Sequence, residues 1–159
     1  MSRNRKTHAT KLIQGLALAL LIAAFATPAF ADSGRVTVVS HSSFEKTVEN
    51  LEAAVGQGGM MVMARVDQGN MLSMTGLKLK AKLFLVGNPT VGKKLFAQDP
   101  GVGLYVPLRV FVAETKDGKV VISYDTASSM LGQFDNDTIR MTAAMLDQKL
   151  GGLAKMAAR

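Results

Sequence analysis

Residues 106–125 read VPLRVFVAETKDGKVVISYD, and this segment is the clearest structural signal in the chain. Two runs rich in β-branched residues, 106–114 and 119–125, flank the tetrapeptide 115–118. That tetrapeptide ends in Asp117 and Gly118, a pair that tolerates the backbone angles of tight turns between strands. The stretch therefore predicts an antiparallel β-hairpin.

The rest of the chain adds three strands to this hairpin. Alternating or β-branched apolar runs predict strands over 35–40, 60–66 and 78–86. Helical spacing of apolar residues predicts helices over 44–56, within 67–76, over 90–98 and from about 135 to 157. Ser42 and Glu45 fit a capping box for the first helix. We expect an α+β two-layer sandwich, in which one mixed or mostly antiparallel sheet of about five strands carries helices on one face.

The first 31 residues are predicted to be a cleaved secretory signal peptide. A basic segment, the apolar run LIQGLALALLIAAFA and Ala29-Phe30-Ala31 follow one another in the order of such signals. The apolar run holds about 15 residues, fewer than the roughly 20 that span a membrane. We expect a single globular domain over 32–159, periplasmic or secreted, with no stable membrane anchor after cleavage. An uncleaved anchor is the alternative.

Composition excludes several kinds of chemistry. The 159 residues include 19 basic and 12 acidic side chains and no cysteine. A thiol nucleophile and a thiolate metal site are therefore excluded. Aromatic residues make up 6% of the chain, and none lies between Lys78, Lys80 and Lys82 to form a stacking platform, so we expect no nucleic-acid partner. These lysines are expected to protect a solvated strand from edge pairing. The alternative is a basic stripe for an acidic lipid or polymer.

The segment 87–94, GNPTVGKK, resembles a phosphate-binding P-loop because it follows an apolar strand and precedes a helix. Lys94, however, stands where a hydroxyl would have to coordinate magnesium. We expect a structural strand–turn–helix connection. A milder alternative is an anion site made by backbone N–H groups and lysines at the helix start.

The leading functional hypothesis is a non-catalytic module that binds a partner protein or a small anionic or amphipathic molecule. No cofactor is expected. A homodimer contact is expected near Tyr105, Phe111 and Val112. The candidate ligand-binding residues follow strand ends: Asp67, Gln68, Asn88, Thr90, Gly92 and Lys93.

Two alternatives remain open. Methionine thioethers bind copper(I) or silver, and a candidate soft-metal cage consists of Met61, Met63, Met71 and Met74. Strand alternation places Met60 on the opposite face, and flexible core packing is the competing explanation. The other alternative is an enzyme of unknown class using Asp67 or His41. No Gly-x-Ser-x-Gly elbow supports it.

The sequence also resembles a known family. Over about 40–153 the chain is similar to the domain of unknown function family 302, a family of small α+β domains that often pair as dimers. The resemblance establishes no activity. Many members carry histidine directly after the aspartate, whereas this chain has Gln68, so a metal or proton-transfer role of that histidine is not expected here. The matching motifs are Ser43-Phe44, Gly59, Val66-Asp67, Gly87-Asn88-Pro89, Gly92, Leu95, Gly103-Leu104, Pro107-Leu108 and residues 119–124.

Overall fold

The computed structural model describes residues 34–159, so the predicted signal peptide lies outside the described residues. Five strands, five α-helices and one 3₁₀ helix follow one another in this part of the chain. Their bounds are β1 (Arg35–Val39), α1 (Phe44–Gln57), β2 (Met61–Val66), α2 (Gln68–Ser73), β3 (Ala81–Gly87), α3 (Pro89–Phe96), η1 (Pro100–Leu104), β4 (Leu108–Glu114), β5 (Val120–Asp125), α4 (Ala127–Leu131) and α5 (Asp137–Ala157).

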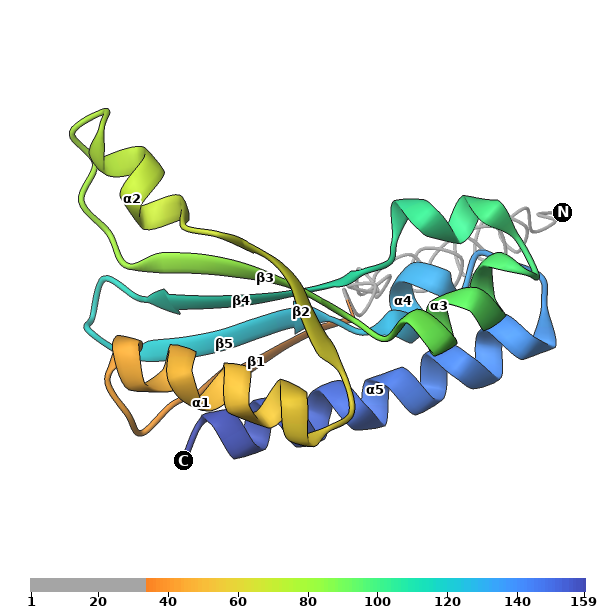
Figure 1. Ribbon diagram of the computed structural model, residues 1–159. Helices are drawn as coiled ribbons and strands as arrows, with labels where there is room; N and C mark the ends of the chain where they lie inside the picture. Colours follow the sequence, from red (N-terminus) through yellow and green to blue (C-terminus); the bar gives the residue numbers. More distant parts are fainter. Residues whose placement is uncertain (1–33) are drawn as a thin grey trace, which may run out of the picture. The chain divides into compact units, whose positions relative to one another are not determined.

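The five strands form one antiparallel sheet in the order β1-β5-β4-β3-β2. The hairpin predicted from 106–125 is confirmed, because β4 and β5 pair from Glu114↔Val120 to Val110↔Tyr124. Helices α1 and α5 lie side by side under the sheet (Figure 1). The expected α+β sandwich is therefore confirmed.

Alternation along the strands gives the sheet two different faces. Leu108, Val110 and Val112 of β4 are buried toward α1 and α5, and the core also includes Phe84 and Ile122 of the neighbouring strands. The opposite face, here called the open face, carries the alternate residues of the same strands. Val112 is fully buried, so it does not share a surface with Phe111 as the dimer expectation assumed.

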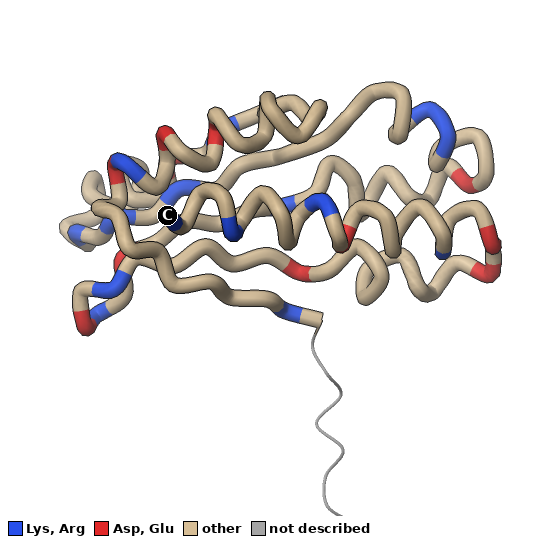
Figure 2. The backbone as a smooth tube through the Cα atoms, turned by 90° about the horizontal axis from the view of Figure 1, so that it is seen from below, with Lys and Arg blue, Asp and Glu red and all other residues tan. Residues whose placement is uncertain are grey.

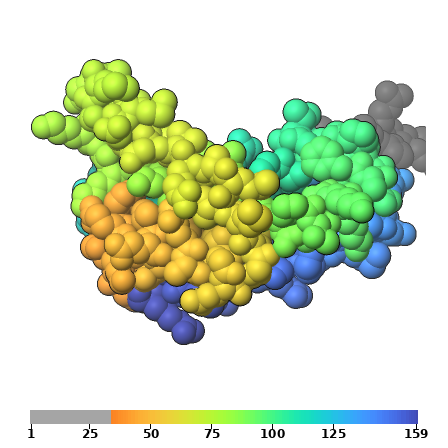
Figure 3. All heavy atoms as spheres, in the orientation of Figure 1, coloured from red at the N-terminus to blue at the C-terminus, as the bar shows by residue number. Residues whose placement is uncertain are grey.

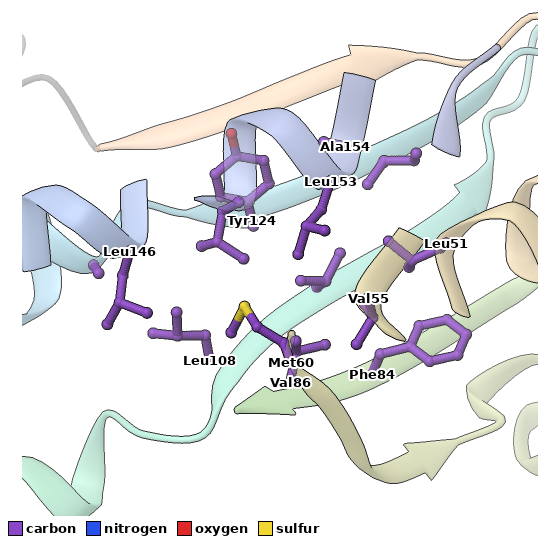
Figure 4. Packing of buried hydrophobic residues seen from close by; sticks show 14 of the residues in the cluster. Leu51, Val55, Met60, Phe84, Val86, Leu108, Tyr124, Leu146, Leu153 and Ala154 are labelled. Carbon is purple, nitrogen blue, oxygen red and sulfur yellow. The ribbon is translucent and has the colours of Figure 1, made fainter. Parts of the chain in front are cut away.

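The core joins the sheet to both long helices. Leu51 and Val55 of α1 meet Phe84 and Val86 of β3 in one cluster, which Leu146 of α5 extends (Figure 4). Burial of one such side chain contributes about 1.5–3 kcal/mol. The last helix, predicted from the helical spacing of its apolar residues, is confirmed as α5, and those residues are buried: Ile139, Ala143, Leu146, Leu150, Leu153 and Ala157.

Helix α1 begins one residue later than the capping box predicts. Ser43 is the N-cap and accepts a hydrogen bond from the Lys46 backbone N–H at 3.2 Å. The Ser42 hydroxyl instead donates to the Arg159 carbonyl at 2.8 Å. The Glu45 carboxylate forms an ion pair with Lys80, and its Oε1 atom lies 3.0 Å from the Lys80 Nζ atom. The capping-box prediction was therefore wrong, because tertiary partners engage both side chains.

Residues 67–80, here called the α2 arm, project from one end of the sheet (Figure 1). Its base is tightly packed, since a Cβ atom at Gly69 would lie 2.5 Å from the Leu79 carbonyl oxygen. Its outer surface exposes Met71 and Met74. Strand β3 begins only after the arm, at Ala81, so Lys78 precedes the strand in which the sequence had placed it.

Charged residues of both signs alternate over the surface formed by α1 and α5 (Figure 2). Two ion pairs of α1 are part of this pattern: Lys46 Nζ lies 3.1 Å from Glu49, and Arg65 Nε of β2 lies 2.6 Å from Glu52. Beyond the helices, Lys82 Nζ lies 3.4 Å from Asp67. Lys80 pairs with acids on both sides, so it does not add to a continuous basic stripe.

Candidate functional site

The connection from β3 to α3 is organised by Asn88. Its Oδ1 atom accepts hydrogen bonds from the backbone N–H groups of Thr90 at 2.8 Å and Val91 at 3.2 Å. Its Nδ2 atom donates to the Gly59 carbonyl at 2.7 Å, which ties the start of α3 to the turn before β2. Pro89 occupies the first helical turn, where a missing N–H costs nothing.

This arrangement uses the donors that an anion would need. Pro89 has no N–H, Thr90 and Val91 donate to the Asn88 side chain, and the Gly92 N–H donates to the Asn88 carbonyl at 2.8 Å. Residues 89–92 therefore leave no backbone donor for a phosphate or another small anion. The likeness of 87–94 to a P-loop ends at this point.

A pocket of about 360 Å³ lies beside α3, and we call it the apolar pocket. This volume is within the range of small-molecule sites. Lys93 is the one charged residue among the described residues that line it. The remaining walls come from the ends of β2 and β3, the segment before β4, and α5. Representative wall residues are Met60, Met63, Val91, Phe96, Pro107 and Leu146.

Gly87 and an irregularity in β2 shape one wall of this pocket. A Cβ atom at Gly87 would lie 2.9 Å from the Met63 sulfur, so the glycine gives that thioether room. The pairing register of β2 shifts between Val62 and Ala64, which marks a bulge at Met63. Both Met60 and Met63 line the pocket, although strict alternation places them on opposite faces.

The structure divides the six predicted ligand-binding residues between two places. Asn88, Gly92 and Lys93 line the apolar pocket, and Thr90 lies on the same helix without lining it. Asp67 and Gln68 follow the opposite end of β2, because Met61 pairs with Gly87 whereas Val66 pairs with Leu83. Gln68 instead lines a hollow on the open face.

Asp67 has a structural role in α2. Its carboxylate accepts a hydrogen bond from the Asn70 backbone N–H at 2.9 Å, and this bond, together with Lys82, holds the pKa of Asp67 below its usual value. His41 is bound through its backbone N–H to the Ala158 carbonyl at 2.9 Å. Neither residue lines the apolar pocket.

The four methionines of the soft-metal hypothesis also lie apart. Met63 lines the apolar pocket and Met61 is exposed on β2, whereas Met71 and Met74 belong to the α2 arm beyond the other end of that strand. Within residues 34–159, no group of three or more histidine, cysteine, aspartate or glutamate residues is placed to hold a metal ion.

Sequence reasoning missed most of the pocket wall. Residues 60, 96, 107 and 146 come from four separate segments, and no local pattern joins them. The available signal was Asn88-Pro89 after an apolar strand, which marks where a chain leaves a sheet and a hollow can form. That signal identifies the start of α3, but it does not identify the residues of other segments that form the rest of the pocket wall.

The fold and the pocket define a two-layer α+β sandwich domain with an apolar pocket at one end of its sheet. The chain belongs to the family described as "Domain of unknown function DUF302", whose family model matches residues 36–157. The family predicted from the sequence is therefore confirmed.

The chain is also similar to a solved structure and to part of several curated proteins. A crystal structure of an uncharacterized conserved DUF302 protein from Bacillus stearothermophilus has a similar fold, with a TM-score of 0.73 at 20% sequence identity; the match covers 79% of this chain and 98% of that one. Proteins named fluoride-specific ion channel FluC, from Brucella suis and Brucella melitensis, are 39% identical over 90 residues, or 56% of this chain.

The chain spans about a third of the length of these curated relatives, 35% and 33% respectively. The activity in their names therefore belongs to proteins much longer than the matched segment. In the described part of this chain, the helices are too short or too polar to cross a lipid bilayer.

Proposed function

We propose that this domain is a non-catalytic binding module for a small amphipathic molecule. The apolar part of the ligand occupies the apolar pocket, and its polar or negatively charged end lies near Lys93. The observation that carries this proposal is the pocket itself, about 360 Å³ in volume with one charged residue on its lining.

The wall chemistry supports an apolar ligand body. Removal of apolar surface from water stabilises a complex by about 25 cal/mol per Å² before the costs of association are subtracted. Met60 and Met63 have flexible thioether side chains that adapt to ligands of different shape. Phe96 is half-exposed, 46%, and offers an aromatic surface at the same place.

The hydrogen bonds of Asn88 favour an amphipathic molecule over a small anion. A small anion needs several converging donors, and the backbone donors of residues 89–92 are already engaged. The Lys93 ammonium can still attract a carboxylate, but the ligand must gain most of its binding free energy from the apolar wall.

Two helical glycines provide a matched test with decanoate as the probe. A Cβ atom at Gly92 or at Gly152 would meet nothing within 4 Å, but only Gly92 lines the pocket. Leucine should stabilise either helix by about 0.5–1 kcal/mol relative to glycine. By isothermal titration calorimetry, we expect Gly92→Leu to bind decanoate at least tenfold more weakly than the wild type, with no loss of folding stability. Gly152→Leu should bind as the wild type does.

A charge variant separates the two parts of the proposed ligand. Lys93→Gln should weaken binding of decanoate and leave binding of decanol unchanged, because only decanoate carries a charge. No saturable binding of decanoate to the wild type, or equal binding by Gly92→Leu, would contradict the proposal.

Two further expectations stay predictions. Export to the periplasm or secretion rests on the leader-like pattern of residues 1–31, and cell fractionation with mass spectrometry of the mature N-terminus tests it. The homodimer rests on the residues near Tyr105 and Phe111 and on the family resemblance, and sedimentation equilibrium tests it.

A further inference from the structure

The open face carries a second hollow of about 550 Å³, here called the arginine hollow. Its lining runs from the start of α2 across the strands. Figure 3 shows the α2 arm projecting from the rest of the molecular surface. Four strands contribute to the hollow, and Gln68 closes it at the start of α2. Its charged, polar and aromatic lining residues include Arg35, Arg109, Phe111, Ser123 and Asp125.

Two arginines in this hollow accompany one acid. Arg35 holds Asp125 in a two-point contact, with Nε 2.8 Å from Oδ1 and a terminal nitrogen 3.1 Å from Oδ2. This contact also raises the pKa of Arg35. Arg109 lies one residue beyond the Val110↔Tyr124 pair, which places it across from Asp125 in the sheet. Both oxygens of that carboxylate are nevertheless engaged by Arg35.

Arg109 forms no ion pair with another residue of the described part of the chain. The other two charged residues of the lining, Arg35 and Asp125, form an ion pair with each other. Arg109 therefore gives the hollow a net positive charge. The neighbouring Phe111 packs against Leu83 in the adjacent strand and gives the floor an apolar patch. The Ser123 hydroxyl, which lies 3.0 Å from that of Thr37, adds a polar wall.

We propose that the arginine hollow is a second ligand site, which binds a small oxyanion, a carboxylate or a phosphate ester, through the guanidinium of Arg109. A guanidinium presents a planar fork of donors that matches two oxygen atoms of such a group. The apolar part of the ligand lies against Phe111. This site differs from the apolar pocket in its residues and in the source of its affinity, which is charge rather than apolar burial.

The protein is titrated with benzoate or with phenyl phosphate, and binding is monitored by ¹H–¹⁵N NMR. We expect saturable shifts of the Arg109 Nε–H signal and of the backbone signals of Phe111 and Ser123. The probe with the tighter binding identifies carboxylate or phosphate as the preferred group. Arg109→Gln should weaken binding at least tenfold. Arg109→Lys, which keeps the charge and loses the fork, should weaken it to an intermediate extent.

Lys116→Gln is the control, because it removes one positive charge from the β4–β5 turn outside the hollow. It should leave binding unchanged. Absence of saturable shifts at Arg109, or equal weakening by Lys116→Gln, would overturn the proposal. If Arg109→Gln does not fold, Arg109→Lys decides the question. Gly92→Leu should not affect this site, so failure of one proposal leaves the other standing.

Discussion

At the residue scale, Asn88 bears most directly on the ligand class that we propose. Its oxygen caps α3 and its nitrogen holds the Gly59 carbonyl, so both ends of the amide are used inside the protein. An anion at this helix start would have to displace a formed cap, and loss of such a cap costs about 0.5–2 kcal/mol. The pocket beside the helix is left to ligands that bind through apolar contact.

Asp117 provides a prediction about pH at the residue scale. Lys119 lies 2.8 Å from its carboxylate and the Thr115 hydroxyl donates to it at 2.6 Å, which lowers the pKa of Asp117 from 3.8 to about 2. Because the folded-state pKa lies below the unfolded value, this group stabilises the protein above about pH 4, and the contribution is lost as pH falls toward 2.

NMR titration of the Asp117 carboxyl carbon should therefore give a midpoint near 2. Asp117→Asn should reduce the pH dependence of the free energy of unfolding between pH 4 and pH 2. A midpoint at the ordinary aspartate value would show that the turn does not hold the carboxylate in these contacts.

At the scale of elements, the α2 arm depends on close contact at Gly69. A methyl group there would lie 2.5 Å from the Leu79 carbonyl oxygen and 3.2 Å from the Ala81 backbone nitrogen, and backbone atoms cannot move aside easily. Gly69→Ala should destabilise the protein by about 1–3 kcal/mol. The measurement is the urea unfolding midpoint.

Gly56→Ala is the matched control, since a Cβ atom at Gly56 meets nothing within 4 Å in α1. It should stabilise the protein by about 0.5–1 kcal/mol, because alanine is the better helix former. If both variants had the same effect on the midpoint, the close packing at the base of the arm would be refuted.

The elements themselves show what the sequence could predict. The β4–β5 hairpin and the buried stripe of α5 follow from local periodicity, which strands of six or seven residues and a helix of 21 residues express clearly. The five-residue η1 and α4 were missed, because so few residues show no apolar period. The start of β3 was placed too early, since 78–80 alternate like a strand but belong to the α2 arm.

The site was less predictable than the fold for a physical reason. Asn88, Gly92 and Lys93 carry local turn and helix signals, so the sequence indicates them. Met60 and Met63 both line this pocket because β2 has a bulge at Met63. Leu146 lines it because α5 packs against the sheet at this end. Asp67 and Gln68 were grouped with α3 because both follow strand ends, but β2 and β3 are antiparallel and those ends lie at opposite sides of the sheet.

At the scale of the whole molecule, one sheet carries two hollows of different chemistry. The apolar pocket lies beside α3, and the arginine hollow lies on the open face. The helices α1 and α5 fill the other face with the core (Figure 4). The apolar pocket is thus bounded by α3, α5 and the strand ends, whereas the arginine hollow lies where helices leave the sheet uncovered.

Methionine methyl NMR tests the central proposal most directly, because the ten methionines of the chain sample the competing locations. The protein would be labelled with ¹³C at the methionine methyl groups and titrated with decanoate. We predict saturable shifts of Met60 and Met63 and unchanged signals from Met71, Met74 and the exposed Met141. Unchanged Met60 and Met63 signals, or shifts confined to Met71 and Met74 in the α2 arm, would contradict a ligand site in the apolar pocket.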